Sequence, residues 1–183
     1  MGIYKYIRNS WQSETPEIKA LWKDRLISWR REPSTLRLEH PTRLDRARAL
    51  GYRAKDGVII VRQRVNRGTH RREDWSGGRH SSNMQIRMNL QFNYQSIAER
   101  RVNDVYHNCE VLGSYFVAKD GKHAWYEVIL VDRSHPQVLA DERLAGVAKQ
   151  RARAYRGLTS ANRKTRGLRH KGKGTEHARG KRF

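Results

Sequence analysis

The sequence contains little of what several classes of protein require. Its single cysteine, Cys109, allows neither an intramolecular disulfide nor a cysteine-based zinc cluster. No stretch approaches the roughly twenty consecutive apolar residues of a membrane-spanning helix, and the first residues lack the apolar run of a secretory signal. We therefore expect no membrane partner, a reducing compartment, and Cys109 as a small buried residue of a strand.

Acidic residues are also scarce. The chain has 18 Asp and Glu against 39 Lys and Arg, which leaves a net charge of +21 on 183 residues and an isoelectric point near 10.9. Because counterion release from phosphates gives such proteins high, salt-dependent affinity, the charge indicates a nucleic acid as the partner. The same charge makes copies of the chain repel one another, so we expect no homo-oligomer.

The basic tail, residues 151–183, has a composition that suits RNA. It holds twelve Lys or Arg and one acid, and its apolar residues stand singly between charges and glycines. Such a segment offers too little apolar surface to offset the entropy cost of ordering, so we expect it to be disordered until it meets a polyanion. Five glycines would let its backbone approach phosphates closely: Gly157, Gly167, Gly172, Gly174 and Gly180.

A long helix is predicted near the start of the chain. Thr15, Pro16 and Glu17 supply a capping hydroxyl, a proline at the first helical position and an acid near the positive helix end, and Pro33 ends the helix. An apolar stripe at helical spacing is formed by Ile18, Leu21, Trp22, Leu26 and Trp29. The tryptophans could stack on RNA bases, but this spacing favours a position in the core.

A short extended piece and a compact helix follow. Residues 35–40, TLRLEH, are extended, and residues 43–50 are predicted to form a helix. Thr42 and Asp45 match a capping box at its start, and Gly51 provides its stop.

A strand with a basic ledge is predicted at residues 58–65, VIIVRQRV, because β-branched residues alternate there. The face that begins with Val58 continues with Arg62 and Arg64, so we expect it to leave the core halfway along. Residues 66–83 form a long polar, glycine-rich loop whose arginines indicate a second RNA-contacting extension. A merely solvated loop is the alternative.

The second half of the chain predicts a helix at residues 93–107 and a hairpin. Strands at 109–118 and 123–131 flank Asp120-Gly121, a strong turn signal, and residues 137–150 indicate a short exposed helix. This order predicts an α+β domain, a small antiparallel sheet with packed helices and long basic N-terminal, internal-loop and C-terminal extensions.

Three parts follow from this organisation. Residues 1–34 form an N-terminal helical extension, and residues 35–135 form the α+β core with its basic loop at about 66–83. Residues 136–183 comprise a helical segment and the basic RNA-binding tail.

The motifs that would indicate catalysis or a metal site are not convincing. Gly174 and Gly180 are wrongly spaced for a phosphate-binding loop, and the scattered histidines give no zinc set. Glu127, Asp132 and His135 lie near one strand end, but proximity in sequence gives no shared pocket, and we expect Glu127 to face solvent or pair with an arginine. We predict no enzyme and no cofactor, with magnesium held, if at all, by RNA phosphates.

Three long segments carry a resemblance to a known family. Residues 41–68, 111–136 and 155–182, together with the opening MGIYKYIRNSW, are similar to the L15e family of archaeal and eukaryotic large-subunit ribosomal proteins. The resemblance covers nearly the full chain. It implies a structural protein of the cytoplasmic ribosome, bound to large-subunit rRNA beside neighbouring ribosomal proteins, with a four-stranded antiparallel sheet whose first strand is TLRLEH. The chain departs from the family pattern at Glu73, Asp74 and Trp75 in the loop and at Arg100.

The predicted rRNA contacts come from this resemblance and from the charge pattern. The resemblance implies contacts from Arg43, Arg46, Arg48, Arg53, Lys55, Arg156, Arg163, Lys164, Arg166, Lys171 and Lys173. The charge pattern adds Arg62, Arg64, Arg67, Arg71, Arg72, Arg79, Arg151, Arg153, Arg169, His170 and Arg179. The alternatives are an RNA-processing enzyme or an RNA chaperone acting outside the ribosome, and a chromatin-type DNA binder, which suits the interleaved glycines and arginines less well.

Overall fold

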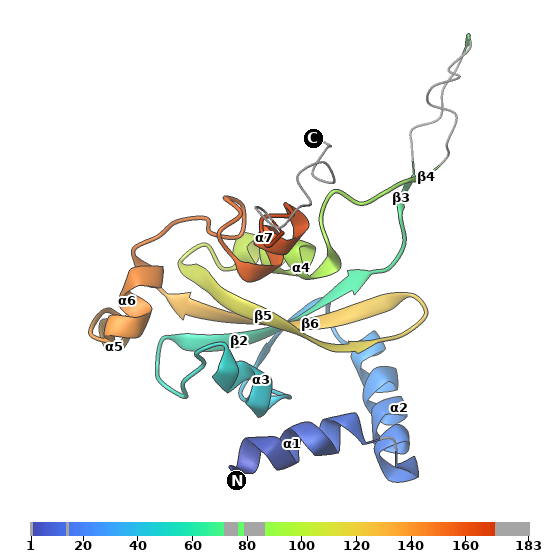
Figure 1. Cartoon of the computed structure of the whole chain (residues 1–183), viewed down its shortest axis with the longest axis horizontal. Coiled ribbons are helices and arrows are strands. Elements are labelled where there is room, and N and C mark those ends of the chain that lie inside the picture. The colour runs from blue at the N-terminus through green and yellow to red at the C-terminus, as the bar shows by residue number, and fades with distance from the viewer. Residues whose placement is uncertain (1, 14, 72–76, 79–86, 171–183) are drawn as a thin grey trace.

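The computed structural model describes residues 2–13, 15–71, 77–78 and 87–170. Its centre is a four-stranded antiparallel sheet in the order β1-β2-β6-β5, seen near the middle of Figure 1. The strands are β1 (Thr35–Leu38), β2 (Val58–Asn66), β5 (Cys109–Lys119) and β6 (His123–Asp132). The predicted α+β class with a small sheet of about four strands is confirmed, and so is the hairpin around Asp120-Gly121.

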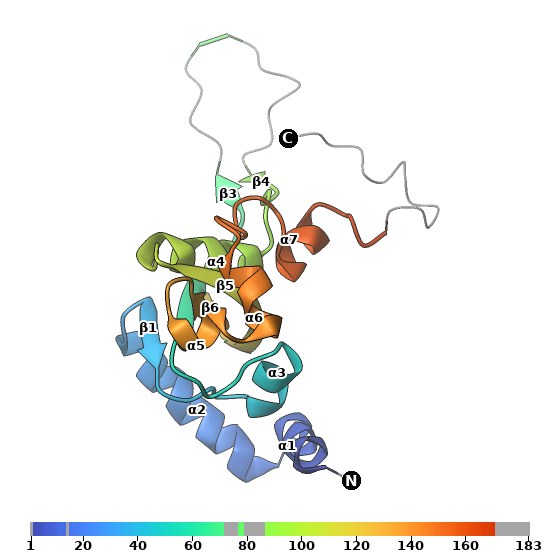
Figure 2. The same cartoon turned by 90° about the vertical axis from the view of Figure 1, so that its left-hand side faces the viewer.

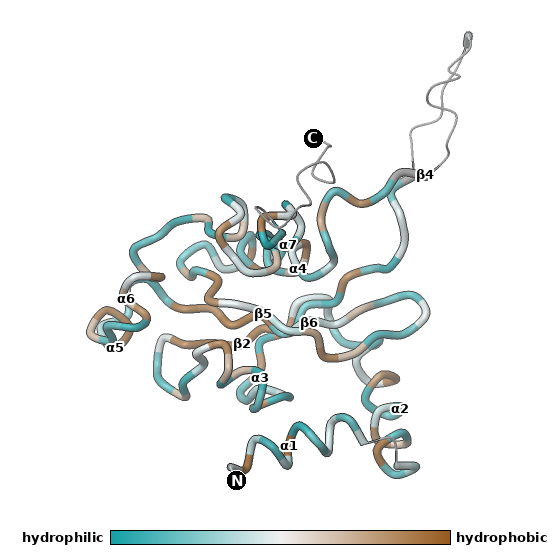
Figure 3. Tube along the Cα trace, in the orientation of Figure 1, coloured by the Kyte–Doolittle hydropathy of each residue, from teal (hydrophilic) through white to brown (hydrophobic). Residues whose placement is uncertain are grey.

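Helices cover both faces of the sheet. On one face lie α1 (Ile3–Gln12), α2 (Pro16–Arg31) and α3 (Leu44–Ala49), and on the other lie α4 (Tyr94–Val105) and α7 (Ser160–Thr165), as Figures 1 and 2 show. Hydrophobic residues gather along the strands between these layers (Figure 3). Because β2 alternates, Val58 and Ile60 enter the α2 side of the core while Val61 and Val65 pack against α4.

Four tryptophans lie in the core or pack against it. Trp11, Trp22, Trp29 and Trp125 form a row of neighbouring rings, with successive centroids 4.7, 5.9 and 6.1 Å apart. The row runs from α1 through α2 to β6, so it attaches the N-terminal helices to the sheet. The interpretation of the α2 stripe as core is confirmed for Trp22, Leu26 and Trp29, whereas Leu21 is 48% exposed.

Thr15 is the N-cap of α2 as predicted, but its hydroxyl makes no capping bond, and the capping box predicted at Thr42 is wrong. Arg43, the N-cap of α3, makes no side-chain capping bond. Thr42 instead donates to Glu127 through its backbone N–H at 3.0 Å and through its hydroxyl. The side-chain caps that form in the described residues, at Asn93, Asp141 and Thr159, were not predicted. Asn93 caps α4, because its Oδ1 accepts from the backbone N–H of Ser96 at 2.7 Å.

The segment predicted as one exposed helix at 137–150 is two short helices, α5 (Pro136–Leu139) and α6 (Glu142–Ala148). The prediction of exposure is wrong for one side of the segment. Val138, Leu144 and Ala148 are buried in the core on the α2 side of the sheet, because the chain turns back over β5 and β6.

The internal loop begins with structure. β3 (His70–Arg71) pairs antiparallel with β4 (Arg87–Met88), and this two-stranded ladder closes the base of the loop. It lies on the same side of the sheet as α4 and α7 in Figure 1. Residues 72–76 and 79–86 lie outside the described residues.

Candidate nucleic-acid interface

Residues 151–170, which we name the C-terminal strap, cross α4 and end in the turn after α7 (Figures 1 and 2). Ala154, Thr159, Ala161 and Asn162 are each at most 3% exposed. The predicted disorder of the tail is therefore wrong for the strap, because small side chains and buried hydrogen bonds fix it to the domain. Residues 171–183 lie outside the described residues.

The start of the strap is held by a buried carboxylate. Glu110 of β5 is 3% exposed and accepts from the backbone N–H groups of Ala152 at 2.8 Å and Arg153 at 3.1 Å. Arg153 also donates from Nη1 to the carbonyl of Val111 at 2.9 Å. Burial lowers the pKa of the Arg153 guanidinium, against the attraction of Glu110 and Glu99, which raises it.

A second buried carboxylate holds the middle of the strap. Glu99 of α4 is 1% exposed and accepts from Ser114 Oγ and Thr159 Oγ1, both at 2.5 Å. Burial raises the pKa of Glu99, although these two hydrogen bonds and Arg153 act in the opposite direction.

Asn162 of α7 completes the attachment. Its Oδ1 accepts from Ser96 Oγ at 2.6 Å, and its Nδ2 donates to the carbonyl of Ala154 at 2.7 Å. Thr159 is the N-cap of α7. The strap is thus bonded to α4, to β5 and to itself.

The outer surface of the strap is basic. Its backbone is fixed while six Arg and Lys side chains are exposed: Arg151, Arg156, Arg163, Lys164, Arg166 and Arg169. His170, at its end, is exposed too. Six of the predicted basic contacts are therefore brought together on one fixed segment.

A second basic group lies on the opposite side of the sheet, around α3 (Figure 1). Arg46 and Arg53 are exposed, and Arg48 is half-buried. Lys55 is exposed and pairs with Asp141 at 2.9 Å. Arg43 is turned inward, because it pairs with Asp45 at 3.0 Å and lies 4.6 Å from the centre of the Trp11 ring.

The ledge predicted on β2 does not form at Arg62. Arg62 is 8% exposed, donates to Glu32 Oε2 at 2.5 Å and lies 4.2 Å from the centre of the Trp29 ring. Arg64 donates to the carbonyl of Arg30 at 2.7 Å, and Arg67 donates to the carbonyl of Asp120. The helix α2 covers this face of the strand, which the alternation in β2 could not reveal.

Some predicted contacts cannot be placed. Arg71 is described only as a backbone position of β3. Arg72, Arg79, Lys171, Lys173 and Arg179 lie outside the described residues.

The structure also exposes basic and aromatic side chains that were not predicted as contacts. On α1, Tyr4 and Tyr6 are 41% and 64% exposed, and Lys5 and Arg8 are exposed beside them. The alternation of tyrosine with Lys and Arg in IYKYIR was the available signal.

Comparison with known proteins identifies the chain. The family model described as Ribosomal L15 matches residues 2–183. The chain belongs to this family of large-subunit ribosomal proteins. The predicted resemblance is confirmed, and the family places the chain in the cytoplasmic ribosome.

Several archaeal relatives are similar over nearly the full length, all named large ribosomal subunit protein eL15. The chain is 48% identical over 179 residues to that of Methanocella arvoryzae, covering 96% of this chain and 91% of the relative. It is 49% identical over 181 residues to that of Methanocorpusculum labreanum, with 97% and 93% covered. It is 47% identical over 182 residues to that of Thermoplasma volcanium, with 97% and 92% covered.

In this member of the Ribosomal L15 family, the carboxylate weighed for catalysis is structural. Glu127 is 0% exposed, so the expectation that it faces solvent is wrong. It accepts from Thr42 and from the Tyr115 hydroxyl at 2.5 Å. Burial raises its pKa, against the hydrogen bonds of Thr42 and Tyr115, which lower it. Glu127 ties the segment before α3 to the sheet.

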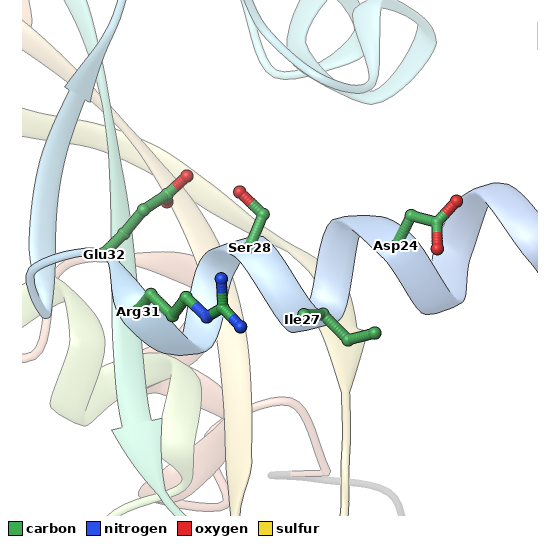
Figure 4. Close-up of a pocket in the computed structure, with 5 residues that line it drawn as sticks. All are labelled: Asp24, Ile27, Ser28, Arg31 and Glu32. Carbon is green, nitrogen blue, oxygen red and sulfur yellow. The ribbon is translucent and has the colours of Figure 1, made fainter.

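Other features that could indicate chemistry are weak. Across the described residues, no group of three or more His, Cys, Asp or Glu could hold a metal ion, and no helix is long and apolar enough to cross a membrane. An open hollow on α2 is lined by Asp24, Ile27, Ser28, Arg31 and Glu32 (Figure 4). It contains none of the residues weighed for catalysis. Cys109 is 3% exposed, and burial, followed by the Asp132 charge, raises the pKa of its thiol to about 11.

Proposed function

We propose that this ribosomal protein binds and stabilises large-subunit rRNA as a structural, non-enzymatic constituent of the subunit, through two basic surfaces. The strap surface consists of Arg151, Arg156, Arg163, Lys164, Arg166 and Arg169. The α3 surface consists of Arg46, Arg53 and Lys55. The observation that carries the proposal is the fixed backbone beneath the strap surface, which presents six exposed cations together.

Fixed arginines suit folded RNA. The guanidinium group grips phosphate oxygens through two parallel hydrogen bonds and stacks on unpaired bases. A segment that is already ordered does not lose backbone freedom when it binds, so more of the contact energy appears as affinity. The two surfaces lie on opposite faces of the sheet (Figure 1), so the domain can lie between two RNA elements and hold them together.

The predicted contacts divide by how exposed their side chains are. Arg43, Arg62, Arg64 and Arg153 are buried or half-buried and bond to other parts of the protein, so we assign them to the stability of the domain. Arg67 is exposed although it donates to the carbonyl of Asp120, and its contact with RNA stays a prediction. The strap and α3 surfaces are assigned to RNA. The contacts expected from Arg48, Arg71, Arg72, Arg79, His170, Lys171, Lys173 and Arg179 stay predictions.

The proposal includes no cofactor. Magnesium would reach this site with the RNA, bound to phosphates, because the basic surfaces repel a free cation. Neighbouring large-subunit proteins are the expected protein partners, and the chain enters the subunit as a single copy.

Salt-dependent binding to an rRNA transcript tests the proposal. If the six cations of the strap surface each contact a phosphate, the logarithm of the affinity falls with the logarithm of salt concentration with a slope of roughly 4 to 5. The double variant Arg163→Ala with Lys164→Ala should weaken binding and reduce that slope by about 1.5.

The matched control removes two charges elsewhere. Lys119 and Lys122 are exposed at the turn end of the β5–β6 hairpin, outside both proposed surfaces. Lys119→Ala with Lys122→Ala should leave affinity and slope close to those of the wild type. Equal losses from the two pairs would show that net charge alone drives binding and would refute the assigned surface.

A further inference from the structure

Buried acidic side chains are unexpected in a protein with a net charge of +21. An acid opposes binding to phosphate, and a buried carboxylate costs free energy unless hydrogen bonds compensate it. Among the described residues, Glu99, Glu110 and Glu127 are buried at 3% exposure or less. Glu99 and Glu110 both bond to the strap, at positions 159 and 152–153.

Glu110 sets the direction in which the strap begins. The two backbone N–H groups that it accepts belong to consecutive residues, so the carboxylate fixes both peptide units. One of these residues, Ala152, has a φ of +51°, which is costly for any residue with a Cβ. Glu110 compensates that cost and holds the turn that leads to Arg156 and the rest of the strap surface.

Glu99 fixes the strap again seven residues later. It joins α4 to β5 through Ser114 and to the strap through Thr159. The Thr159 hydroxyl that donates to Glu99 also accepts from the Asn162 side chain at 3.2 Å, so one carboxylate orients the cap of α7. Arg163, Lys164 and Arg166 are on or directly after that helix.

We propose that Glu99 and Glu110 are positioning residues for RNA binding: without touching RNA, they fix the strap so that its cations match the phosphates of one RNA structure. This inference rests on the proposed function. The inference predicts an effect opposite to that of charge alone: neutralising either acid raises the net charge by one, yet it should weaken binding to the correct RNA. An ordinary electrostatic role predicts the opposite.

The test compares two RNA probes at one salt concentration. The full-length protein and its Glu99→Gln and Glu110→Gln variants are titrated with a large-subunit rRNA transcript from the same organism and with unstructured polyuridylate. We expect about tenfold weaker binding of the variants to the transcript. Polyuridylate should bind equally well or slightly better, because it does not require a fixed strap. Glu142→Gln, at an exposed acid of α6, makes the same charge change and should alter neither affinity.

Hydrogen exchange reports whether the strap is released. The backbone amides of residues 151–170 should exchange faster in both variants, while those of the β5–β6 hairpin keep their protection. Thr159→Val removes the hydroxyl that donates to Glu99 without touching a charge, and it keeps the test available if Glu99→Gln fails to fold. It also removes the cap of α7, and Glu99→Gln also alters the contact with Ser114. The combined variant should therefore lose less affinity than the sum of the two single losses, because the Glu99–Thr159 hydrogen bond is removed by both changes.

Three results would overturn the inference. The variants could bind the transcript as tightly as the wild type, lose affinity for both RNAs equally, or leave strap exchange unchanged. If the wild type itself shows no preference for the transcript over polyuridylate, the proposed function fails and the RNA role of both acids fails with it. The exchange data then separately decide whether the two acids hold the strap.

Discussion

Replacing Arg62 with alanine should separate stability from RNA binding. The change removes a stacked cation, 4.2 Å from the Trp29 ring centre, worth about 1 to 2 kcal/mol when desolvated. It also leaves the Glu32 carboxylate without its partner. Because the Glu32 side chain is 27% exposed, water screens that loss, and we assign it about 1 kcal/mol instead of the roughly 3 to 5 of a fully buried pair. The free energy of unfolding should fall by about 2 to 3 kcal/mol in total.

Urea denaturation followed by tryptophan fluorescence measures this loss. Arg62→Ala should lower the urea midpoint and leave unchanged the slope of the unfolding free energy against urea concentration. For a chain of this length, the melting temperature should drop by roughly 5 to 10 °C. Affinity for rRNA in native buffer should stay within about twofold, because the guanidinium of Arg62 faces the core instead of solvent.

Arg46→Ala is the matched control. Arg46 is exposed on α3, and its side chain makes no hydrogen bond or ion pair with any residue the structure describes. Its loss should change stability by less than about 0.5 kcal/mol while weakening rRNA binding and reducing the salt slope by about 1. The reasoning is refuted if the effects are exchanged, so that Arg62→Ala weakens RNA binding at unchanged stability.

Three further changes test how the fold is held. Asp120→Ala should cost about 1 kcal/mol at neutral pH, because the carboxylate accepts from Lys122 and His123 in the hairpin turn. Burial alone would raise the pKa of Asp120, but these hydrogen bonds and Arg30 lower it to about 2. Its contribution is therefore complete above the usual value of 3.8 and is lost as pH falls toward 2, so urea midpoints of variant and wild type should converge there. For Glu127 the pH dependence has the opposite sign, because burial raises the pKa of its carboxyl group. The stability of the wild type relative to Glu127→Gln should be greatest below pH 4.5 and should decline as pH rises through the pKa of Glu127 in the folded protein. A constant difference across urea titrations at a series of pH values would contradict this. Gly57→Ala should destabilise by about 2 to 4 kcal/mol in thermal melts, because its φ is +83° and a Cβ would lie 2.7 Å from the His135 side chain. Gly121→Ala, where a Cβ meets nothing within 4 Å, should be nearly neutral by comparison.

Local signals predicted most of the sheet and the main helices. Asp120-Gly121 marked the hairpin, and the alternation in VIIVRQRV marked β2. Pro16 marked the start of α2, and Gly51, with a φ of +95°, marked the end of α3. Each of these signals acts within a few residues, so a single sequence is enough to recognise it.

The wrong predictions for Thr42 and for the strap have the same physical cause: both segments form hydrogen bonds with residues that are distant in sequence. Thr42 looked like a cap because Asp45 is near it in sequence, yet it bonds to Glu127, 85 residues away. The strap looked too polar to fold because its anchors, Glu99 and Glu110, lie in earlier elements. Composition alone cannot show that a buried carboxylate will meet two backbone N–H groups.

The sequence shows which residues are basic, but it does not show which of them the fold leaves exposed. Arg156, Arg163, Lys164 and Arg166 are exposed as an RNA contact requires. Arg62 is not, since only the packing of α2 over β2 decides which arginines of a strand reach solvent. The charge pattern therefore indicates the kind of partner, and the fold decides which cations are available to it.

The attachment of the strap also affects how copies of the chain behave toward one another. β5 is an edge strand, and such edges invite strands of other molecules to add to them. Two of its carbonyl oxygens are already occupied by side chains: Val111 by Arg153, and Ser114 by Gln95 at 2.8 Å. Each bond occupies a carbonyl that an added strand would need, so this edge offers fewer acceptors for intermolecular β-sheet before the protein joins a ribosome.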